Sequence, residues 1–245
     1  MKTKFLLLCV MAVLITGSSF AQTVSLTGMP SIKAWSSLGA GTDPIFVDGN
    51  TLPPAAFTIN LDADVSINSL TIGDGTAPPA NPADNITINL NGFNLSITND
   101  LTYNASVGII NSSGGGTLTI GGNVVAMAGS GTVTLNADNM SSVTIDGNVD
   151  ISPAATETFD TGNSTITING DFTCGGAVNA DNGTLNVAGD FDGTGGTQSG
   201  AFYVSGTAIN CSSCSPPPPT PIAPWSIGLA ALLIIGFVAV RRLRS

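Results

Sequence analysis

Residues 117–124 read TLTIGGNV, and the same short pattern returns as VTIDGNV at 143–149, ITINGDF at 166–172 and LNVAGDF at 185–191. In each copy two aliphatic residues alternate with polar ones. A turn of Gly, Asn, Asp or Ala follows, and then another apolar residue. Alternation with a period of two is typical of a β-strand that buries one face. These copies therefore predict a chain built from one repeated β unit.

The repeat extends along most of the chain. When the copies are aligned on the aliphatic residue before the turn, the aligned positions are 17 to 25 residues apart: Val47, Ile72, Ile97, Ile120, Ile145, Ile168, Val187 and Val204. From the third copy onward an apolar residue also stands four positions later: Leu101, Val124, Val149, Phe172 and Phe191. A period in this range indicates stacked repeats.

Glycine and amide residues also recur at fixed places. Glycine stands in each turn, at Gly122, Gly147, Gly170 and Gly189, where it allows a bend that a side chain would resist. A second set of strands precedes the first, and each contains an amide or carboxylate: Asn60, Asn89, Asn111, Asn136, Asp160 and Asn179. We expect this series to form hydrogen bonds along the stack, as identical side chains do in stacked parallel strands.

The pattern predicts an all-β fold, a right-handed parallel β-helix (β-solenoid) of about eight rungs. Residues 22–40, with Trp35, are expected to cap the first rung. The alternative is an antiparallel sandwich, which short strands and frequent turns also suit. A sandwich has no reason to keep Asn and Gly in register, so the solenoid is favoured. The central region resembles repetitive parallel β-solenoid surface proteins.

Both ends of the chain indicate export. Residues 1–21 have Lys2 and Lys4, an apolar run and small residues before an expected cleavage site after Ala21, as in a secretory signal; a retained anchor is the alternative. Residues 222–240 carry no charge and predict a transmembrane helix. The expected division is a signal at 1–21, a cap at 22–40, a solenoid at 41–210, a Cys- and Pro-rich linker at 211–221, the transmembrane helix at 222–240 and a basic cytoplasmic tail at 241–245.

The tail also carries a motif. PIAPW is followed by the apolar stretch and then RRLRS at the C-terminus. This arrangement resembles the sorting signals that exosortase-type transpeptidases process. The resemblance implies an exosortase-like enzyme as a partner and a sorting role for Pro221, Ile222, Pro224, Trp225, Arg241, Arg242 and Arg244. A simple C-terminal anchor is the alternative.

The charge distribution excludes several functions. Between residues 22 and 220 the only basic residue is Lys33, against sixteen Asp and Glu, and the chain has no histidine. Nucleic acid is therefore not expected as a partner, because phosphate binding needs clustered Lys and Arg. Without histidine the commonest general base and metal ligand is absent. We expect no cofactor, no metal and no enzymatic activity.

Two pairs of aspartates are the candidates for chemistry. Asp190 and Asp192 stand in GDFDGTGG, which suggests a calcium loop but has no glutamate at the closing position. Asp146 and Asp171 lie at near-equivalent places in successive copies and could form the carboxylate pair of a carbohydrate-active β-helix enzyme. Acidic residues at turns are usually solvated, and we favour that interpretation for both pairs.

Three cysteines remain after the signal. Cys211 and Cys214 are expected to pair in an exported protein, closing a small loop before the proline spacer. A redox motif is the other interpretation of CxxC, but it needs a βαβ setting that the sequence does not indicate. Cys174 has inward parity after Phe172 and is expected to be buried and inert, although an odd thiol leaves intermolecular pairing open.

Hydroxyl and amide side chains occupy the outward positions of the strands, in the pairs Ser69 and Thr71, Asn94 and Ser96, Thr117 and Thr119, Ser142 and Thr144, Thr165 and Thr167, and Thr184 and Asn186. This double series resembles the T-x-T faces of ice-binding solenoids, but Thr and Ser are favoured outward residues on any strand. The hypothesis from sequence is an exported cell-surface protein with a structural or adhesive role. Its partners would be the membrane and extracellular polysaccharide or other cell-surface components.

Overall fold

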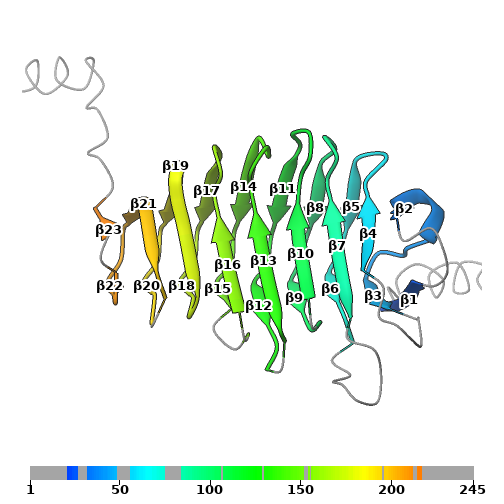
Figure 1. Ribbon diagram of the computed structural model, residues 1–245, viewed down its shortest axis with the longest axis horizontal. Helices are drawn as coiled ribbons and strands as arrows, with labels where there is room; N and C mark the ends of the chain where they lie inside the picture. Colours follow the sequence, from blue (N-terminus) through cyan, green and yellow to red (C-terminus); the bar gives the residue numbers. More distant parts are fainter. Residues whose placement is uncertain are drawn as a thin grey trace, which may run out of the picture.

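The protein is a parallel β-solenoid (Figure 1). The computed structural model describes residues 21–26, 32–48, 56–74, 84–105, 107–128, 130–151, 154, 156–194, 196–211 and 214–216. Within these residues the secondary structure is 23 strands and one 3-10 helix, and all the strand pairs recorded there are parallel. Parallel pairing rules out the antiparallel sandwich.

The strands form three faces that run along the rod. Face A consists, in order, of β1 (Gln22–Leu26), β3 (Pro44–Asp48), β6 (Leu70–Ile72), β9 (Leu101–Tyr103), β12 (Val124–Ala126), β15 (Val149–Asp150), β18 (Phe172–Thr173), β20 (Phe191–Asp192) and β22 (Ala208–Ile209). Face B consists of β2 (Ile32–Ala34), β4 (Phe57–Asn60), β7 (Asn85–Asn89), β10 (Val107–Asn111), β13 (Thr132–Asn136), β16 (Thr156–Asp160) and the first parts of β19 (Ala177–Val187) and β21 (Gln198–Val204).

Face C completes the cross-section. It consists of β5 (Val65–Ile67), β8 (Leu95–Ile97), β11 (Thr117–Ile120), β14 (Ser142–Ile145), β17 (Thr165–Ile168), the second parts of β19 and β21, and β23 (Cys214–Ser215). Faces B and C join at one end of the rod because β19 continues round the corner between them and pairs with both β16 and β17.

Each complete turn supplies one strand to each face. The described residues form about seven turns, from β4–β5–β6 to the turn of β21 and β22. The predicted number of about eight included the incomplete N-terminal turn, in which β2 and β3 are joined by the 3-10 helix η1 (Trp35–Leu38). Neighbouring strands lie about 4.8 Å apart in any sheet, so seven turns make a rod roughly 34 Å long.

The core is a narrow column of aliphatic residues that ends in aromatic rings. On face A the predicted apolar series is in register and fully buried, in the order Leu101, Val124, Val149, Phe172 and Phe191. Toward the C-terminal end the rings of Phe159, Phe172, Phe191 and Phe202 follow one another with centroid separations of 4.9, 5.3 and 6.0 Å. Tilted ring pairs at these distances stabilise a core beyond their buried area.

The register corrects the first two members of the predicted aliphatic series. On face C the column is Ile67, Ile97, Ile120, Ile145, Ile168, Val187 and Val204. Ile72 instead lies on face A, where it pairs with Tyr103. Val47 also lies on face A, in β3. The mistake arises because VSI at 65–67 and LTI at 70–72 both alternate apolar and polar residues, so periodicity does not say which strand belongs to which face.

The N-terminal end of the rod is closed by η1 and the strands around it. Trp35 is buried and packs edge-on against Phe46, with ring centroids 5.1 Å apart. Ser36 donates from its backbone N–H and its hydroxyl to the carboxylate of Asp62, in the first complete turn. These hydrogen bonds lower the pKa of Asp62. Residues 22–40 thus supply the first strands of faces A and B as well as a cap.

Several predicted segments lie outside the described residues. These are the secretory signal except its last residue, the transmembrane helix at 222–240 and the basic tail at 241–245. Within the part of the chain that the structure describes, no helix has the length and apolar character to cross a membrane. The right-handed winding stays a prediction.

Candidate functional site

A ladder of side-chain oxygens runs along the corner before face A. The Oδ1 atom of one turn accepts the backbone N–H of the equivalent residue on the next turn. The donor and acceptor pairs are Asn123 to Asp100 at 2.7 Å, Asn148 to Asn123 at 2.9 Å, Asp171 to Asn148 at 2.9 Å, Asp190 to Asp171 at 2.8 Å and Thr207 to Asp190 at 2.6 Å. The sequence signal was present, because Asn or Asp stands three residues after each aliphatic position from Ile97 to Val187.

The glycines beside this ladder are required by close packing of one turn on the next. A Cβ on Gly147 would lie 2.5 Å from the carbonyl oxygen of Gly122 and 2.7 Å from Oδ1 of Asn123. The backbone N–H of Gly147 donates to that same carbonyl at 3.0 Å. Gly170 and Gly189 meet the turn below at similar distances. Close approach of two backbones, and not the predicted bend, is therefore what excludes a side chain here.

The predicted amide series at the corner after face B is in register but is not a continuous ladder. Asn89 pairs with Asn60 and with Asn111, and its Nδ2 donates to Oδ1 of Asn60 at 3.0 Å. Oδ1 of Asn136 instead accepts the N–H of Asp138 two residues later. Asp160 accepts in the same way from Gly162. These side chains mainly close the turn of their own rung, as Asx turns do.

The outward side of face C carries an in-register series of hydroxyl groups. Ser66, Ser96, Thr119, Thr144 and Thr167 face one another across successive strands, followed by Asn186 and Tyr203. A second series lies beside it, in which Thr117 pairs with Ser142 and Thr165 with Thr184. The sequence pattern predicts Ser69 and Thr71 in this double series, but they lie outside face C. Thr71 is part of β6 on face A, and Ser69 immediately precedes β6.

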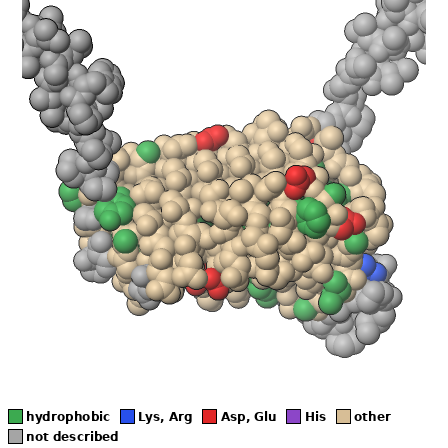
Figure 2. Space-filling model, turned by 90° about the horizontal axis from the view of Figure 1, so that it is seen from above, with side chains coloured by type: hydrophobic (Ala, Val, Ile, Leu, Met, Phe, Trp, Pro, Cys, Tyr) green, Lys and Arg blue, Asp and Glu red, His purple; other side chains and the backbone are tan. Residues whose placement is uncertain are grey.

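Charged side chains are sparse on the outward sides of faces B and C, because most of the sixteen acidic residues lie in the segments between strands. Figure 2 shows a side made mostly of uncharged polar side chains and backbone, with scattered carboxylates and several apolar side chains. Lys33 lies on β2, at the N-terminal end of face B. Among the described large apolar side chains, the exposed ones are Ile32, Met127 and Ile209. Recognition of a partner by these faces would therefore depend on hydrogen bonds from hydroxyl and amide groups.

One inward position on face B holds a charged side chain. Glu157 is the single glutamate of the chain, alternates with Phe159 on β16 and is 4% exposed. Its carboxylate accepts hydrogen bonds from the backbone N–H groups of Gly175 and Gly176. Oε2 lies 3.6 Å from Sγ of Cys174. The sequence analysis does not name Glu157 as a candidate. A single glutamate at a position where the repeat normally has an apolar residue could have identified it.

Above Glu157 the surface of face B is hollowed. The hollow has a volume of about 400 Å3 and is lined by Ala154, Thr156, Glu157, Thr158, Gly175, Gly176 and Ala177. On the next rung of face B, small residues stand over this position: Ala177 pairs with Thr158, and Gly175 and Gly176 come directly before it. A Cβ on Gly175 would lie 3.2 Å from Oε2 and 3.4 Å from Oε1 of Glu157. The glycine therefore leaves the carboxylate next to an open space.

Burial sets the protonation of the acid and the thiol. Desolvation raises the pKa of Glu157 above its ordinary value, and the hydrogen bonds from Cys174, Gly175 and Gly176 oppose that shift. Desolvation also raises the pKa of Cys174, to about 12, with the nearby Glu157 adding to the effect. The thiol is fully buried and remains protonated. This placement agrees with the inert thiol expected at that position.

The four aspartates considered as catalytic or calcium-binding candidates accept hydrogen bonds at turns and corners of the rod. Asp190 is an acceptor in the corner ladder, and Asp192 accepts from Thr194 and Asn210, which lowers its pKa. Among the residues that the structure describes, no group of three or more possible metal ligands comes together. For the second pair, Oδ1 of Asp146 accepts from Asn169 at 2.8 Å, while Asp171 is another member of the ladder.

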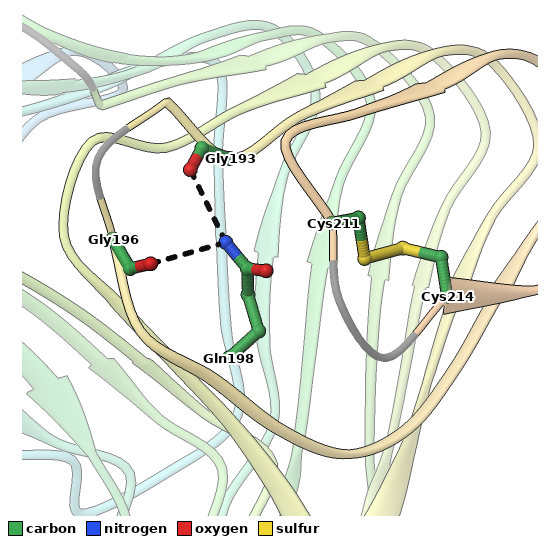
Figure 3. The surroundings of a disulfide bond; sticks show 5 residues. All are labelled: Gly193, Gly196, Gln198, Cys211 and Cys214. Atoms are coloured by element: carbon green, nitrogen blue, oxygen red, sulfur yellow. Dashed lines mark hydrogen bonds between the residues drawn. A yellow bond between two sulfur atoms is a disulfide. The ribbon is translucent and has the colours of Figure 1, made fainter.

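A disulfide bond joins Cys211 and Cys214 at the C-terminal end of the rod, as Figure 3 shows. Both cysteines are partly buried against the core, and Cys214 pairs with Phe202 across the last strands of face C. Beside the disulfide, the side chain of Gln198 donates to the carbonyl oxygens of Gly193 and Gly196 at 3.1 and 3.4 Å. The disulfide thus ties the last strand of face C to the end of the preceding turn. The predicted sorting residues, from Pro221 onward, lie outside the described residues.

Comparison with known proteins identifies no relative. No protein-family model matches the chain, no curated protein matches it, and no solved structure matches it.

Proposed function

We propose that this chain is an exported surface protein whose solenoid is a rigid rod with a structural or adhesive role. The observation that carries the proposal is the regular array of uncharged hydroxyl and amide groups on faces B and C. In a parallel stack these groups repeat about every 4.8 Å, so a partner can make the same hydrogen bond many times. Extracellular polysaccharide, which also repeats hydroxyl groups along its length, is a partner of matching chemistry.

The disulfide supports the exported location in this proposal. Disulfides persist in oxidising compartments and are rare where thiols are kept reduced. The apolar stretch at 222–240 is proposed to anchor the protein in the membrane, with Arg241, Arg242 and Arg244 on the cytoplasmic side. The motif from Pro221 to Trp225 is proposed as the address that an exosortase-like enzyme processes.

Intact mass and cell fractionation test location and processing together. The full-length gene is expressed in a native-like host, and the mature mass is compared with that of a Trp225→Ala variant. Export predicts loss of the first 21 residues. Processing predicts loss of the tail in the wild type but not in the variant. An intact N-terminus on a cytoplasmic protein would overturn the proposal, and an intact tail in the membrane would leave only the anchor.

Binding to polysaccharide is tested separately. Pull-down with insoluble polysaccharides should retain the wild type, and a variant in which Thr119, Thr144 and Thr167 are replaced by valine should bind less. Valine has nearly the shape of threonine but no hydroxyl group, so weaker binding would assign the contact to the hydroxyl series on face C. Equal binding by both proteins would remove face C as the adhesive surface.

Ice binding is a second candidate, which the in-register Thr and Ser series on face C specifically favours. Thermal hysteresis of the purified protein decides it. A freezing point depressed below the melting point in the wild type, and lost in the same valine variant, would replace adhesion by ice binding. No hysteresis would remove this candidate and leave the adhesive role in place.

A further inference from the structure

Among the residues that the structure describes, no basic side chain pairs with the buried carboxylate of Glu157. The chain supplies Lys33 as its one basic residue between 22 and 220, and Lys33 lies on β2. In the order of the sheet, β4, β7, β10 and β13 separate that strand from β16. Buried charges in proteins are normally paired, because an uncompensated charge in a low-dielectric site is costly. Within the described part of the chain, the charge of Glu157 is therefore left to be compensated by a proton or by a bound cation.

The neighbouring turns show that the position does not need an acid for folding. Val133 pairs with Glu157 across the parallel strands, and Gly108 pairs with Val133 one turn earlier. Both are uncharged, and both are buried. An apolar residue would thus continue the column without a desolvation cost. The acid is an exception to the repeat, and it occurs where the surface is hollowed.

The hollow has the features of a small polar binding site. Its volume of about 400 Å3 lies within the range of ligand pockets. Gly175 leaves both carboxylate oxygens next to the open space, and the hydroxyl-bearing residues Thr156 and Thr158 line the same hollow. A ligand seated there meets one negative charge and neighbouring hydroxyl groups.

We propose that the hollow over Glu157 binds an amino sugar, with the primary ammonium group of the sugar against the Glu157 carboxylate. The ammonium supplies the missing cation, and a charge-assisted hydrogen bond to a carboxylate is stronger than a neutral one. The threonines bind the hydroxyl groups beside the amine. The choice of a sugar rests on the proposed adhesive role, and it makes the hollow the place on face B where a basic polysaccharide is recognised.

The test is a titration of the purified full-length protein, followed by NMR, with glucosamine, N-acetylglucosamine and lysine amide. Glucosamine is expected to shift the amide signals of residues 154–158 and 175–177 in a saturable way. N-acetylglucosamine lacks the charged amine and should bind at least about tenfold more weakly, as expected for loss of a hydrogen bond to a charged group. Lysine amide carries a primary amine without the sugar hydroxyls and should also bind more weakly.

Two variants and one control locate the site. Glu157→Gln removes the charge and keeps the size, and Gly175→Ala places a methyl group against both carboxylate oxygens. Both should weaken glucosamine binding about tenfold. Thr134→Ala, on the same face one turn earlier and in register with Thr158, should not.

Four outcomes overturn the proposal: no saturable binding of glucosamine, equal binding of the acetylated sugar, equal binding of lysine amide, or undiminished binding by Glu157→Gln. None of them bears on where the protein is located or whether its tail is cut. The proposed export and anchoring are tested only by the intact-mass and fractionation experiment.

Discussion

Oδ1 of Asn123 accepts the backbone N–H of Asn148, one turn further along the rod, at 2.9 Å. Asn148 repeats the relationship with Asp171 at the same distance. A backbone N–H at a corner has no strand partner, so each side chain satisfies a donor that the fold would otherwise leave to water. The ladder thus ties consecutive turns together at the point where the strands stop.

Replacing Asn123 with alanine should lower the free energy of unfolding by about 1 kcal/mol, because one hydrogen bond between turns is lost. Asn123→Asp should be nearly neutral, since Asp100, Asp171 and Asp190 already act as acceptors in the same ladder. Urea unfolding measures both, with Asn163→Ala at an exposed turn as control. Equal effects of all three changes would show that the ladder adds no stability.

Gly147→Ala should be far more damaging than an alanine elsewhere. Its Cβ would lie 2.5 Å from the carbonyl oxygen of Gly122, which is backbone and cannot move without separating two turns. A loss of about 3 kcal/mol or more is expected. Gly114→Ala is the matched control, because the nearest atom to its Cβ would be 3.9 Å away. Thermal unfolding distinguishes them, and a Gly147→Ala protein as stable as Gly114→Ala would contradict the packing explanation.

Removing the disulfide with Cys211→Ser and Cys214→Ser should loosen the end of the rod and leave the middle intact. A loop this short restricts the unfolded chain little, so the global cost should be about 2 kcal/mol or less. Hydrogen exchange should rise in β21, which pairs with β23, and stay unchanged in β11 and β14. In a solenoid each turn contacts only its neighbours, so a cap acts locally. Uniformly faster exchange would show that the whole rod depends on this cap.

Glu157→Gln should change how stability depends on pH. Burial raises the folded-state pKa of Glu157 above its unfolded value, so the folded protein binds this proton more tightly. The resulting stability is present below the unfolded pKa and is lost as pH rises through the folded pKa. Glutamine does not titrate, so the variant should gain stability relative to the wild type as pH rises.

Urea unfolding of both proteins at a series of pH values measures that difference. Asp62 and Asp192 have lowered pKa values and act in the opposite sense, but they are common to both proteins and cancel. A stability difference that stays constant from about pH 3 to about pH 8 would contradict the raised pKa.

The Cys174 thiol should be unreactive toward alkylating reagents in the folded protein. It is fully buried and its pKa is raised to about 12, so almost no thiolate is present at neutral pH. Mass spectrometry after iodoacetamide treatment should find it unmodified in buffer and fully modified in urea. Rapid labelling in buffer would place the thiol at the surface and reopen intermolecular pairing.

Much of the fold could be predicted from the sequence, because aligning the copies of the repeat also aligns the residues that pair on successive strands. From Ile97 to Val204 the alternation predicted both the inward residues and the partners of each strand on face C. It failed at Ile72, where two strands with the same pattern lie two residues apart, on different faces. The sequence shows where glycine is required but not why, because the close approach of stacked backbones at Gly147 depends on two separate copies of the repeat.

The residues of the candidate site could not be brought together from the sequence. Glu157 and Cys174 are seventeen residues apart, and Gly175 and Gly176 resemble any other turn residues in this chain. Only when β16 and the next turn are stacked does the carboxylate meet two N–H groups, a thiol and an open hollow. The sequence by itself determined that the chain repeats one β unit and favoured parallel stacking, because stacked copies keep the apolar, Gly and Asn positions in register. The tertiary structure alone decided which side chains of different turns meet, because contacts between turns depend on the number of residues at each corner.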